Sequence, residues 1–376
     1  MALAGSCRNG NSTRVCPVIT PFIYEGQPYR VLFGHGTLDR LPDEATRLGC
    51  ERLLVLSTPD QRQSAEQLAA LLGSRCAGIY CGARMHTPVD VTEDAMALVE
   101  KARIDGTVAL GGGSTIGLSK AIALRTDLPQ IAVPTTYAGS EMTQIIGQTE
   151  KGEKTTQVTA KVLPETVIYD VDLTLTLPAR LSVTSGINAM AHAVEALYAT
   201  NTNPIVQLMA EAGIAALYRG LPVIVRSPGD TEARRDALYG AWLSAVCLGQ
   251  TSMAFHHKLC HVLGGSFNLP HAETHTIVLP HVLAYNAPAA RDAVEAIKRA
   301  IGGSGIAGRI YDVAQNAGVP VALRDLGMPE SGIDRAVELA LANSYANPRP
   351  LEPVLLRRLI ANAWAGVRPD QDTYQQ

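Results

Sequence analysis

Histidines are concentrated in one part of the chain. Six of the nine lie between residues 256 and 281. His257 and His261 are four residues apart, so a helix would present both on the same face. His271 follows a Gly-Gly pair and a proline, so we expect it to lie just beyond that helix and to fold back towards it. Imidazoles that converge in this way either bind a metal ion or polarise and protonate a substrate carbonyl near neutral pH.

A second polar group precedes this stretch. Asn188, His192 and Glu195 are spaced at i, i+4 and i+7, which makes a polar stripe on an otherwise apolar helix. We expect that helix to be N-capped by Ser185. If the stripe is buried it needs hydrogen-bonding partners, and the histidine group is the obvious candidate. A stripe that faces solvent is the alternative.

A run of glycines follows an apolar strand that ends at Leu110. A glycine turn between a strand and a helix lets the backbone approach a diphosphate, and the helix N-terminus offers free N–H groups and the positive end of its dipole. The run is not the G-x-G-x-x-G fingerprint, because Ile116 stands where the third glycine belongs, and a plain tight turn is the alternative. The residues expected to contact the cofactor here are Gly111, Gly112, Gly113 and Ser114.

Residues 134–143 form a second loop after an apolar strand, and hydroxyl groups that hydrogen-bond phosphate or ribose are frequent in it. Loops at the carboxyl ends of neighbouring strands frame the crevice in which a dinucleotide lies. The cofactor contacts expected in this loop are Thr135, Thr136, Ser140 and Thr143. Lys161, which lies outside the loop, is also expected to bind the cofactor.

The strand that ends at Ser57 bears on the choice of cofactor. Enzymes restricted to NAD commonly place an acid near the end of the second strand, where it binds the ribose 2′-hydroxyl. Here the first acid is Asp60, and nothing before it strongly repels a 2′-phosphate. We therefore expect NADPH to serve as well as NADH.

The elements that must position these residues follow two patterns. Up to about residue 170, short apolar strands alternate with helices, which is typical of an α/β unit with a largely parallel sheet. After residue 178 helical periods continue to about Ala365, with an isolated strand candidate at 223–225. The expected strands are 22–24, 30–34, 53–57, 78–80, 106–110, 130–134 and 166–170, and the expected helices of the first part are 63–72, 91–103 and 116–124.

These patterns predict three parts in the chain. Residues 1–20 read as a flexible extension, because they are rich in Gly, Ser, Asn and Arg and show no periodicity. Residues 21–178 form an α/β dinucleotide-binding domain with a Rossmann-like parallel sheet, and residues 179–376 form an all-α catalytic domain.

Composition and charge exclude several classes of protein. The 376 residues are 47% hydrophobic and 18% charged, a balance typical of soluble globular proteins. The net charge of −3 provides no basic field for nucleic acid, and four Phe and two Trp make base-stacking surfaces improbable. The longest apolar run, 237–255, is interrupted by glycines and polar residues, which fits a buried helix better than a membrane span.

The seven cysteines are odd in number and none has C-x-x-C spacing, so we expect free thiols in a reducing cytoplasm. No signal peptide is visible.

The motifs taken together resemble those of the iron-containing (group III) alcohol dehydrogenases. The shared features are the Gly-Gly-Gly-Ser turn, the Pro-Thr-Thr…Gly-Ser-Glu-x-Thr loop, the x-His-Ala-x-Glu helix and the His-x3-His…Pro-His segment, in this order over residues 22–365. Tyr137, the string at 256–261 and the opening at 22–26 favour the branch of maleylacetate reductases. The resemblance implies reduction of maleylacetate to 3-oxoadipate by NADH or NADPH during aromatic-ring breakdown, with a small dicarboxylate as substrate and a homodimer as the assembly.

The resemblance also locates the family's metal ligands, one Asp and three His, at Asn188, His192, His257 and His271. A neutral amide is a much poorer ligand than the carboxylate it replaces, so we expect the reaction not to require a metal. If an ion is bound, three imidazoles would hold it, those of His192, His257 and His271. Gly117 departs from the family as well, because the motif usually carries an Asp there.

The implied chemistry adds hydride across a C=C bond conjugated to a ketone. The enone spreads the developing charge onto its ketone oxygen, where hydrogen-bond donors stabilise the enolate without an ion. Protonated histidines would supply part of the positive charge that a dianion needs, so activity would fall above a pH of about 7. The expected roles are polarisation of the ketone by His192, His257 and His271 beside Asn188, proton delivery by His261 or Tyr137, and capture of a carboxylate by Lys258, which faces solvent in the alternative.

Three other functions stay open at this stage. A metal-dependent alcohol dehydrogenase of the same family would lose activity with its metal. A lyase or cyclase related to dehydroquinate synthase would not consume NADH stoichiometrically. A catalytically inactive binding protein is disfavoured by the histidines and by both cofactor loops.

Overall fold

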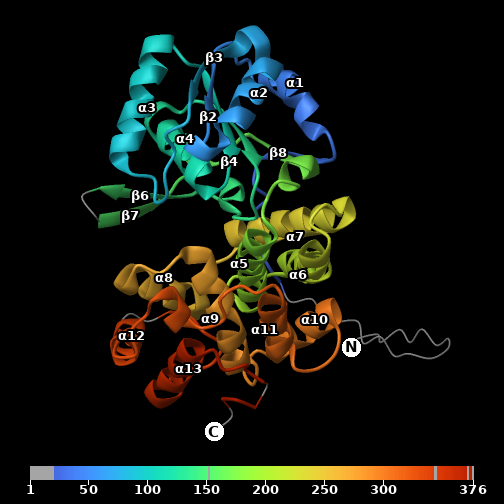
Figure 1. Cartoon of the computed structure of the whole chain (residues 1–376), viewed down its shortest axis with the longest axis vertical. Helices are drawn as coiled ribbons and strands as arrows, with labels where there is room; N and C mark the ends of the chain where they lie inside the picture. The colour runs from blue at the N-terminus through green and yellow to red at the C-terminus, as the bar shows by residue number, and fades with distance from the viewer. Residues whose placement is uncertain (1–20, 151–152, 343–344, 371, 375–376) are drawn as a thin grey trace, which may run out of the picture.

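The computed structural model of the chain describes residues 21–150, 153–342, 345–370 and 372–374. Figure 1 shows an α/β lobe formed by the first half of the chain and a helical lobe formed by the second half, with α5 and α7 near their boundary. The extension expected over residues 1–20 lies outside the described residues.

A six-stranded parallel sheet forms the centre of the α/β lobe, in the order β1-β8-β5-β4-β2-β3. The largely parallel sheet predicted from the alternating pattern is therefore confirmed. Its carboxyl ends meet at one edge, where the glycine turn follows β4 and residues 135–143 follow β5. The strands are β1 (Arg30–Gly34), β2 (Leu53–Leu56), β3 (Cys76–Tyr80), β4 (Gly106–Gly111), β5 (Gln130–Pro134) and β8 (Thr166–Asp170).

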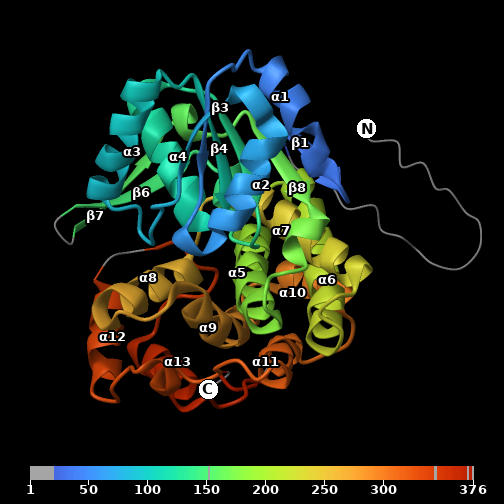
Figure 2. The ribbon, with the colours of Figure 1, turned by 45° about the horizontal axis from the view of Figure 1, so that its top comes forward.

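Helices cover both faces of this sheet, with α3 and α4 on one side and α1 and α2 on the other (Figure 2). Successive strand side chains point to opposite faces. Val55 therefore joins a core cluster with Leu68 of α2, while Leu56 joins another with Val91 of α3. The helices are α1 (Leu41–Arg47), α2 (Arg62–Leu72), α3 (Val89–Ala102) and α4 (Gly113–Thr126).

Two elements of this lobe differ from the sequence prediction. The strand expected over 22–24 is wrong, because these residues pair with no neighbouring strand and Ile23 is 83% exposed. An antiparallel hairpin of β6 (Ile145–Glu150) and β7 (Glu153–Val158) was not predicted. Its strands are largely polar, so they lack the apolar run by which the sheet strands were recognised.

The second half of the chain is helical from Ala179 onward, as far as the structure describes it. The strand candidate at 223–225 is wrong, since it lies inside α6. The predicted domain division near residue 178 falls between β8 and α5 and stays a prediction. The helices are α5 (Ala179–Tyr198), α6 (Pro204–Arg226), α7 (Thr231–Gln250), α8 (Phe255–Phe267), α9 (His271–Asn286), α10 (Arg291–Ile301), α11 (Ile306–Asn316), α12 (Gly332–Leu341) and α13 (Pro353–Ala365).

Helix α6 is long and apolar enough to cross a membrane, with 23 residues and a mean hydropathy of 1.5 in its most apolar window. It packs against α5, α7 and α10. Ile214, Leu217 and Leu221 are fully buried in that packing. We therefore interpret α6 as a core helix of the lobe.

Candidate active site

The glycine turn between β4 and α4 is closely packed on one side and accessible on the other. A Cβ on Gly111, whose φ is +149°, would lie 2.5 Å from Thr115 Oγ1, and one on Gly112 would lie 2.7 Å from Thr136 Oγ1. Gly113 is exposed and Ser114 half-buried at the N-terminus of α4. The first N–H groups of that helix have no acceptor within it, so the turn fits a diphosphate.

The loop over residues 134–143 joins this turn to the helical lobe. At one end it contacts Gly112 through Thr136. At the other, a Cβ on Gly139 would lie 3.5 Å from Cε1 of His192. A ligand that follows the loop from the glycine turn therefore reaches the histidines of the helical lobe.

Two of the hydroxyl side chains in this loop are accessible to a ligand, and two are hydrogen-bonded within the protein. Thr136 and Ser140 are half-buried, so both can be reached by a cofactor. Thr135 is buried and its Oγ1 accepts from Gln61 Nε2 at 2.9 Å. Thr143 Oγ1 accepts from Lys120 Nζ at 3.0 Å and donates to the Ser140 carbonyl at 3.1 Å. The hydroxyls of Thr135 and Thr143 thus shape the loop.

The histidines of α5, α8 and α9 meet below this loop. The rings of His192 and His257 are stacked with centroids 5.0 Å apart. His275 lies 4.8 Å from His257 and 4.8 Å from His256, measured between ring centroids. All four side chains are buried. The polar stripe of α5 therefore faces the α8 histidines in a buried contact.

The N-cap expected at Ser185 is wrong. Helix α5 begins at Ala179, so Ser185 lies within the helix, and its Oγ accepts the N–H of Tyr137 at 3.0 Å.

Glu195 organises the start of α8. Its carboxylate accepts the backbone N–H groups of Ala254 at 2.8 Å and His256 at 2.6 Å, so it caps the helix. The same carboxylate lies 2.7 Å from Nδ1 of His257, which fixes the orientation of that ring. Nε2 of His257 then lacks a hydrogen-bond partner among the described residues. Sequence reasoning placed Glu195 on the polar stripe but gave it no role.

Burial governs the protonation of the inner histidines. It lowers the pKa of His192, His256 and His275 well below the usual value, and neighbouring imidazoles lower it further. These three rings are therefore neutral at pH 7. The expectation that protonated histidines hold the substrate dianion does not apply to them.

Sequence reasoning also missed His256 and His275 as members of the site. Nε2 of His256 lies 3.0 Å from Nδ1 of His275, so one ring donates a hydrogen bond to the other. His275 in turn lies 4.3 Å from the exposed ring of His271, which stacks on exposed His261 at 6.2 Å, between centroids. The clustering of histidines between residues 256 and 281 was the signal that pointed to them.

Two expected site residues, Tyr137 and Lys161, lie away from the histidine cluster. Tyr137 is fully buried beside Arg234 and Ser182, and burial raises the pKa of its hydroxyl, which makes it a poor proton donor. Lys161 is exposed and pairs with Asp127 at 3.8 Å. That pair follows the C-terminal end of α4, about 20 Å along the helix from the glycine turn, because α4 has 14 residues.

Lys258 is half-buried on α8 one residue beyond His257, with Nζ 4.9 Å from the ring centroid of Tyr345. This cation–π contact does not occupy its hydrogen-bond donors. Lys258 therefore remains able to hold a carboxylate.

The residues at the family's metal position do not reproduce its donor set. Asn188 is 4% exposed and its Oδ1 has no hydrogen-bond partner in the described structure, but this oxygen is neutral where the family has a carboxylate. His271 is exposed at the start of α9, where its ring stacks on His261 and lies tilted against His275. This position therefore offers three imidazoles and a neutral amide oxygen where the family has three imidazoles and a carboxylate.

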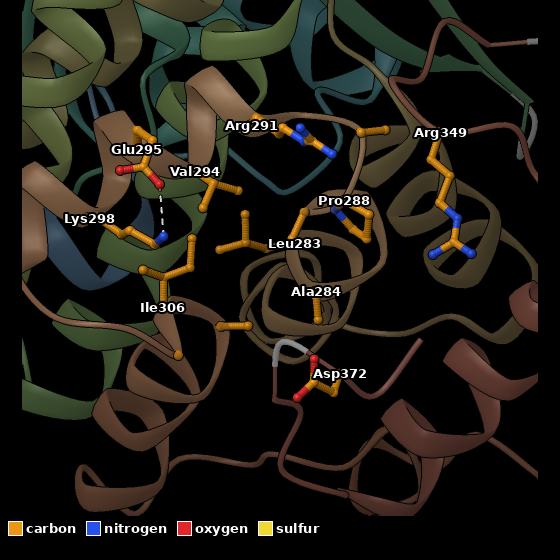
Figure 3. A pocket seen from close by; sticks show the side chains of 14 residues that line it. Leu283, Ala284, Pro288, Arg291, Val294, Glu295, Lys298, Ile306, Arg349 and Asp372 are labelled. Carbon is orange, nitrogen blue, oxygen red and sulfur yellow. Dashed lines mark hydrogen bonds and ion pairs between the residues drawn. The ribbon is translucent and has the colours of Figure 1, made fainter. Parts of the chain in front are cut away.

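The helical lobe also contains a cavity of about 850 Å³ (Figure 3). Arg291, Lys298 and Arg349 point around it from α10 and from the segment before α13, over the apolar side chains of Leu283 and Ile306. None of the expected site residues lines it. This cavity is therefore separate from the two cofactor loops and from the histidine cluster.

Comparison with known proteins agrees with this architecture. Residues 28–171 match the model of the iron-containing alcohol dehydrogenases and residues 182–364 that of the C-terminal part of the same family. The chain is 53% identical to maleylacetate reductase of Sphingobium indicum, over 93% of this chain and 99% of the relative. The crystal structure of maleylacetate reductase from Agrobacterium tumefaciens superposes with a TM-score of 0.90 at 50% identity, covering 93% of this chain and 100% of that one. The fold also matches sulfoacetaldehyde reductase from Bifidobacterium kashiwanohense in complex with NAD+, at a TM-score of 0.85 and 22% identity over 92% and 99% of the chains.

The fold is that of a two-lobed oxidoreductase with a dinucleotide-type α/β lobe. The chain belongs to the iron-containing alcohol dehydrogenase family. Within that family it is similar over nearly its whole length to maleylacetate reductases.

Proposed function

We propose that this chain reduces maleylacetate to 3-oxoadipate with NADH or NADPH. The observation that carries the proposal is the loop over 134–143, which touches Gly112 at one end and His192 at the other. The similarity to maleylacetate reductases at 53% identity over 93% of the chain supports the same substrate. In this proposal the α/β part up to residue 178 binds the cofactor and the helical part after it carries the catalytic residues.

A nicotinamide cofactor held by the glycine turn at Gly111–Gly113 and by the loop over 134–143 would supply a hydride to the alkene carbon that is β to the ketone. The residues of the chain must then stabilise the charge that moves onto the ketone oxygen and provide a proton for the α carbon. Because a carboxylate that accepts Nδ1–H also stabilises the imidazolium form, His257 backed by Glu195 holds a proton at Nε2 with which it polarises the ketone oxygen. The neutral ring of His192 packs beside it.

The substrate's two carboxylates require donors outside the buried rings. Lys258, half-buried next to His257, supplies one positive charge. The exposed rings of His261 and His271 lie at the open end of the same cluster, where a second carboxylate or the proton supply would reach them. Of the two candidates for proton delivery, His261 is thus preferred to buried Tyr137.

The reduction does not require a metal ion in this proposal. The support is the neutral oxygen of Asn188 at the family's metal position and the enone's own ability to carry charge on oxygen. NADPH serves as well as NADH, since Asp60 is exposed and lies beyond the end of β2.

A decisive assay follows absorbance at 340 nm with maleylacetate and either cofactor, before and after EDTA treatment. Stoichiometric oxidation of both cofactors that survives EDTA supports all three statements. Loss of activity with EDTA and recovery with iron or zinc would indicate a metal-dependent dehydrogenase, and no oxidation of either cofactor would exclude the reductase. Comparable kcat/KM values for NADH and NADPH are expected.

We further propose a homodimer in the cytoplasm. Apolar side chains are exposed on Phe22 and Ile23, and on Ile145 and Val158 at the base of the β6–β7 hairpin. Gln144 Nε2 donates to Gln27 Oε1 at 2.6 Å, which brings the two segments near each other. Such a patch is typical of an interface. Light scattering should give twice the chain mass for the wild type and a smaller mass for Ile23→Glu/Val158→Glu; an unchanged mass would exclude this surface.

A further inference from the structure

Next to the altered family position, three buried imidazoles offer a different donor set. We propose that His256, His257 and His275 bind a divalent transition ion such as Zn²⁺ or Co²⁺, and that an ion held there inhibits the reductase. The inhibitory part rests on the proposed function, whereas the binding part does not. This set shares only His257 with the family position at Asn188, His192, His257 and His271.

The three rings lie near enough to one another for their nitrogens to share one ion. One nitrogen from each ring lies within 4.8 Å of the others. Nε2 of His256 and Nδ1 of His275 are already 3.0 Å apart. Donors bound at about 2.1 Å in a tetrahedron lie about 3.4 Å from each other, so the third ring has to approach by about 1.4 Å at most. The hydrogen bond between His256 and His275 is exchanged for two bonds to the ion.

The chemistry of the surroundings favours an ion over an empty cluster. All three rings are buried, with exposures of 0% for His256 and His275 and 7% for His257. Nε2 of His257, the nitrogen that would bind the ion, lacks a hydrogen-bond partner in the described part of the chain, which is costly in a dry interior. Neutral imidazoles suit zinc, cobalt, nickel and copper.

Glu195 completes the arrangement as an outer partner. A metal-binding histidine usually donates its other ring N–H to a carboxylate, which fixes the tautomer and raises the basicity of the donor nitrogen. Glu195 Oε2 lies 2.7 Å from Nδ1 of His257 and is fully buried. His256 is held by the same carboxylate through its backbone N–H at 2.6 Å. Two of the three donors are therefore positioned by one side chain.

Occupation of this site and reduction of the substrate exclude one another at His257. The ion takes the Nε2 lone pair, and the substrate requires a proton on that atom. An ion at this place therefore competes with the substrate's ketone for His257. The access route runs past the exposed rings of His261 and His271, since His271 lies 4.3 Å from His275 between ring centroids.

The test measures binding by a spectrum that does not depend on activity. The EDTA-treated protein is titrated with CoCl₂, and one equivalent should give the intense visible bands of tetrahedral Co²⁺. His256→Gln and His275→Gln should weaken binding by about 100-fold or more, and Glu195→Gln by about 10- to 100-fold. Asn188→Ala, His271→Gln and the exposed surface variant His35→Gln should stay within about threefold of the wild type.

Several results would overturn the assignment. Absence of these bands from the wild type would exclude the site, and loss of binding in His271→Gln with retention in His275→Gln would return it to the family position. X-ray absorption of the Zn²⁺-loaded wild type provides a second measurement should a variant fail to fold, as checked by circular dichroism. Three imidazole nitrogens are expected as protein donors, and a protein carboxylate in the coordination shell would contradict the proposal.

Inhibition is tested on the same preparations. Zn²⁺ should raise the KM for maleylacetate in the wild type, and His275→Gln should require at least about 100-fold more Zn²⁺ for the same effect. Binding without inhibition would refute the competition at His257. An enzyme that binds Co²⁺ as expected but oxidises no NADH with maleylacetate would refute the proposed function and leave the binding site intact.

Discussion

The glycine turn and the histidine cluster lie at opposite ends of one loop, yet they are built from different parts of the polypeptide. The turn is made of backbone, and it works because side chains are missing at Gly111 and Gly112. The cluster is made of side chains whose ring orientations depend on partners such as Glu195. Adding a side-chain atom at Gly111 or Gly112 disrupts the glycine turn, whereas removing a side chain disrupts the histidine cluster.

This difference has an energetic reason. A Cβ at the turn meets Thr115 or Thr136 at less than 3 Å, so repulsion acts at once. An imidazole deleted from the cluster instead leaves buried polar atoms without partners, and it removes the group that handles the proton. We therefore expect changes in the cluster to reduce kcat and changes near the turn to act on cofactor affinity or stability.

The largest effect is expected for His257→Ala. Loss of the proton-holding group should lower kcat/KM by roughly 1,000-fold, within the range of general acid–base catalysis, while the KM for NADH changes little. Steady-state rates at 340 nm measure this, with circular dichroism as a check of folding. His35→Ala, which removes an exposed histidine paired with Asp172, serves as the control and should stay within about threefold. A His257→Ala enzyme within threefold of the wild type would remove this residue from the mechanism.

A smaller effect is expected for Glu195→Gln. The amide keeps the size of the side chain but no longer stabilises an imidazolium on His257, so kcat should fall by about 10- to 100-fold. Because Glu195 acts through His257, its loss should add little to His257→Ala in the double variant. A double variant in which the two single losses add up would indicate that Glu195 has a separate role.

The strands of the sheet, the glycine turn and three of the histidines could be predicted from the sequence. The apolar strands were recognisable because β2, β4, β5 and β8 are buried on both faces and read as continuous apolar runs. Family motifs pointed to the glycine turn and to His192, His257 and His271, because each motif has a characteristic residue spacing within its own segment of the chain. Polar hairpins such as β6–β7 lack this signal.

The partners of the site residues could not be predicted, because they depend on contacts between distant segments. Glu195 meets His257 across 62 positions of sequence, and Arg234 reaches Ser182 next to Tyr137 across 52. Nothing in the spacing of Tyr137 indicated that its hydroxyl would be buried away from the crevice. Likewise, nothing in the sequence around Lys120 indicated that its side chain would be fully buried under the cofactor loop.

The departure from the family at Gly117 allows a more local test on the turn side. A Cβ there would lie 2.3 Å from Oγ1 of Thr87, a residue with φ +46° that leaves the side chain little freedom. Gly117→Ala should therefore lower the free energy of unfolding by about 1–3 kcal/mol and raise the KM for NADH more than it changes kcat. Urea denaturation and initial rates measure the two effects.

Thr87→Ala provides the matched control for this clash. It removes Oγ1, so the Gly117→Ala/Thr87→Ala double variant should recover more than half of the lost stability. If the double variant is as unstable as the sum of the single ones, the cost of Gly117→Ala does not come from contact with Thr87.

The smallest effect concerns Lys120, which anchors the cofactor loop. Its Nζ donates to the carbonyls of Thr143 at 2.7 Å and Ile145 at 2.9 Å, and burial lowers its pKa to about 7. The unfolded chain binds this proton up to a pH of about 10.4, so between pH 7 and that value it binds more protons than the folded one. Stability contributed at this position should therefore rise with pH across that window. The difference in unfolding free energy between the wild type and Lys120→Met, measured by urea denaturation at pH 7, 8 and 9, should grow in favour of the wild type. A difference that is constant or shrinks with pH would mean that the buried amine stays charged, held by Glu141 nearby, and that the loop is anchored by an ion rather than by a neutral donor.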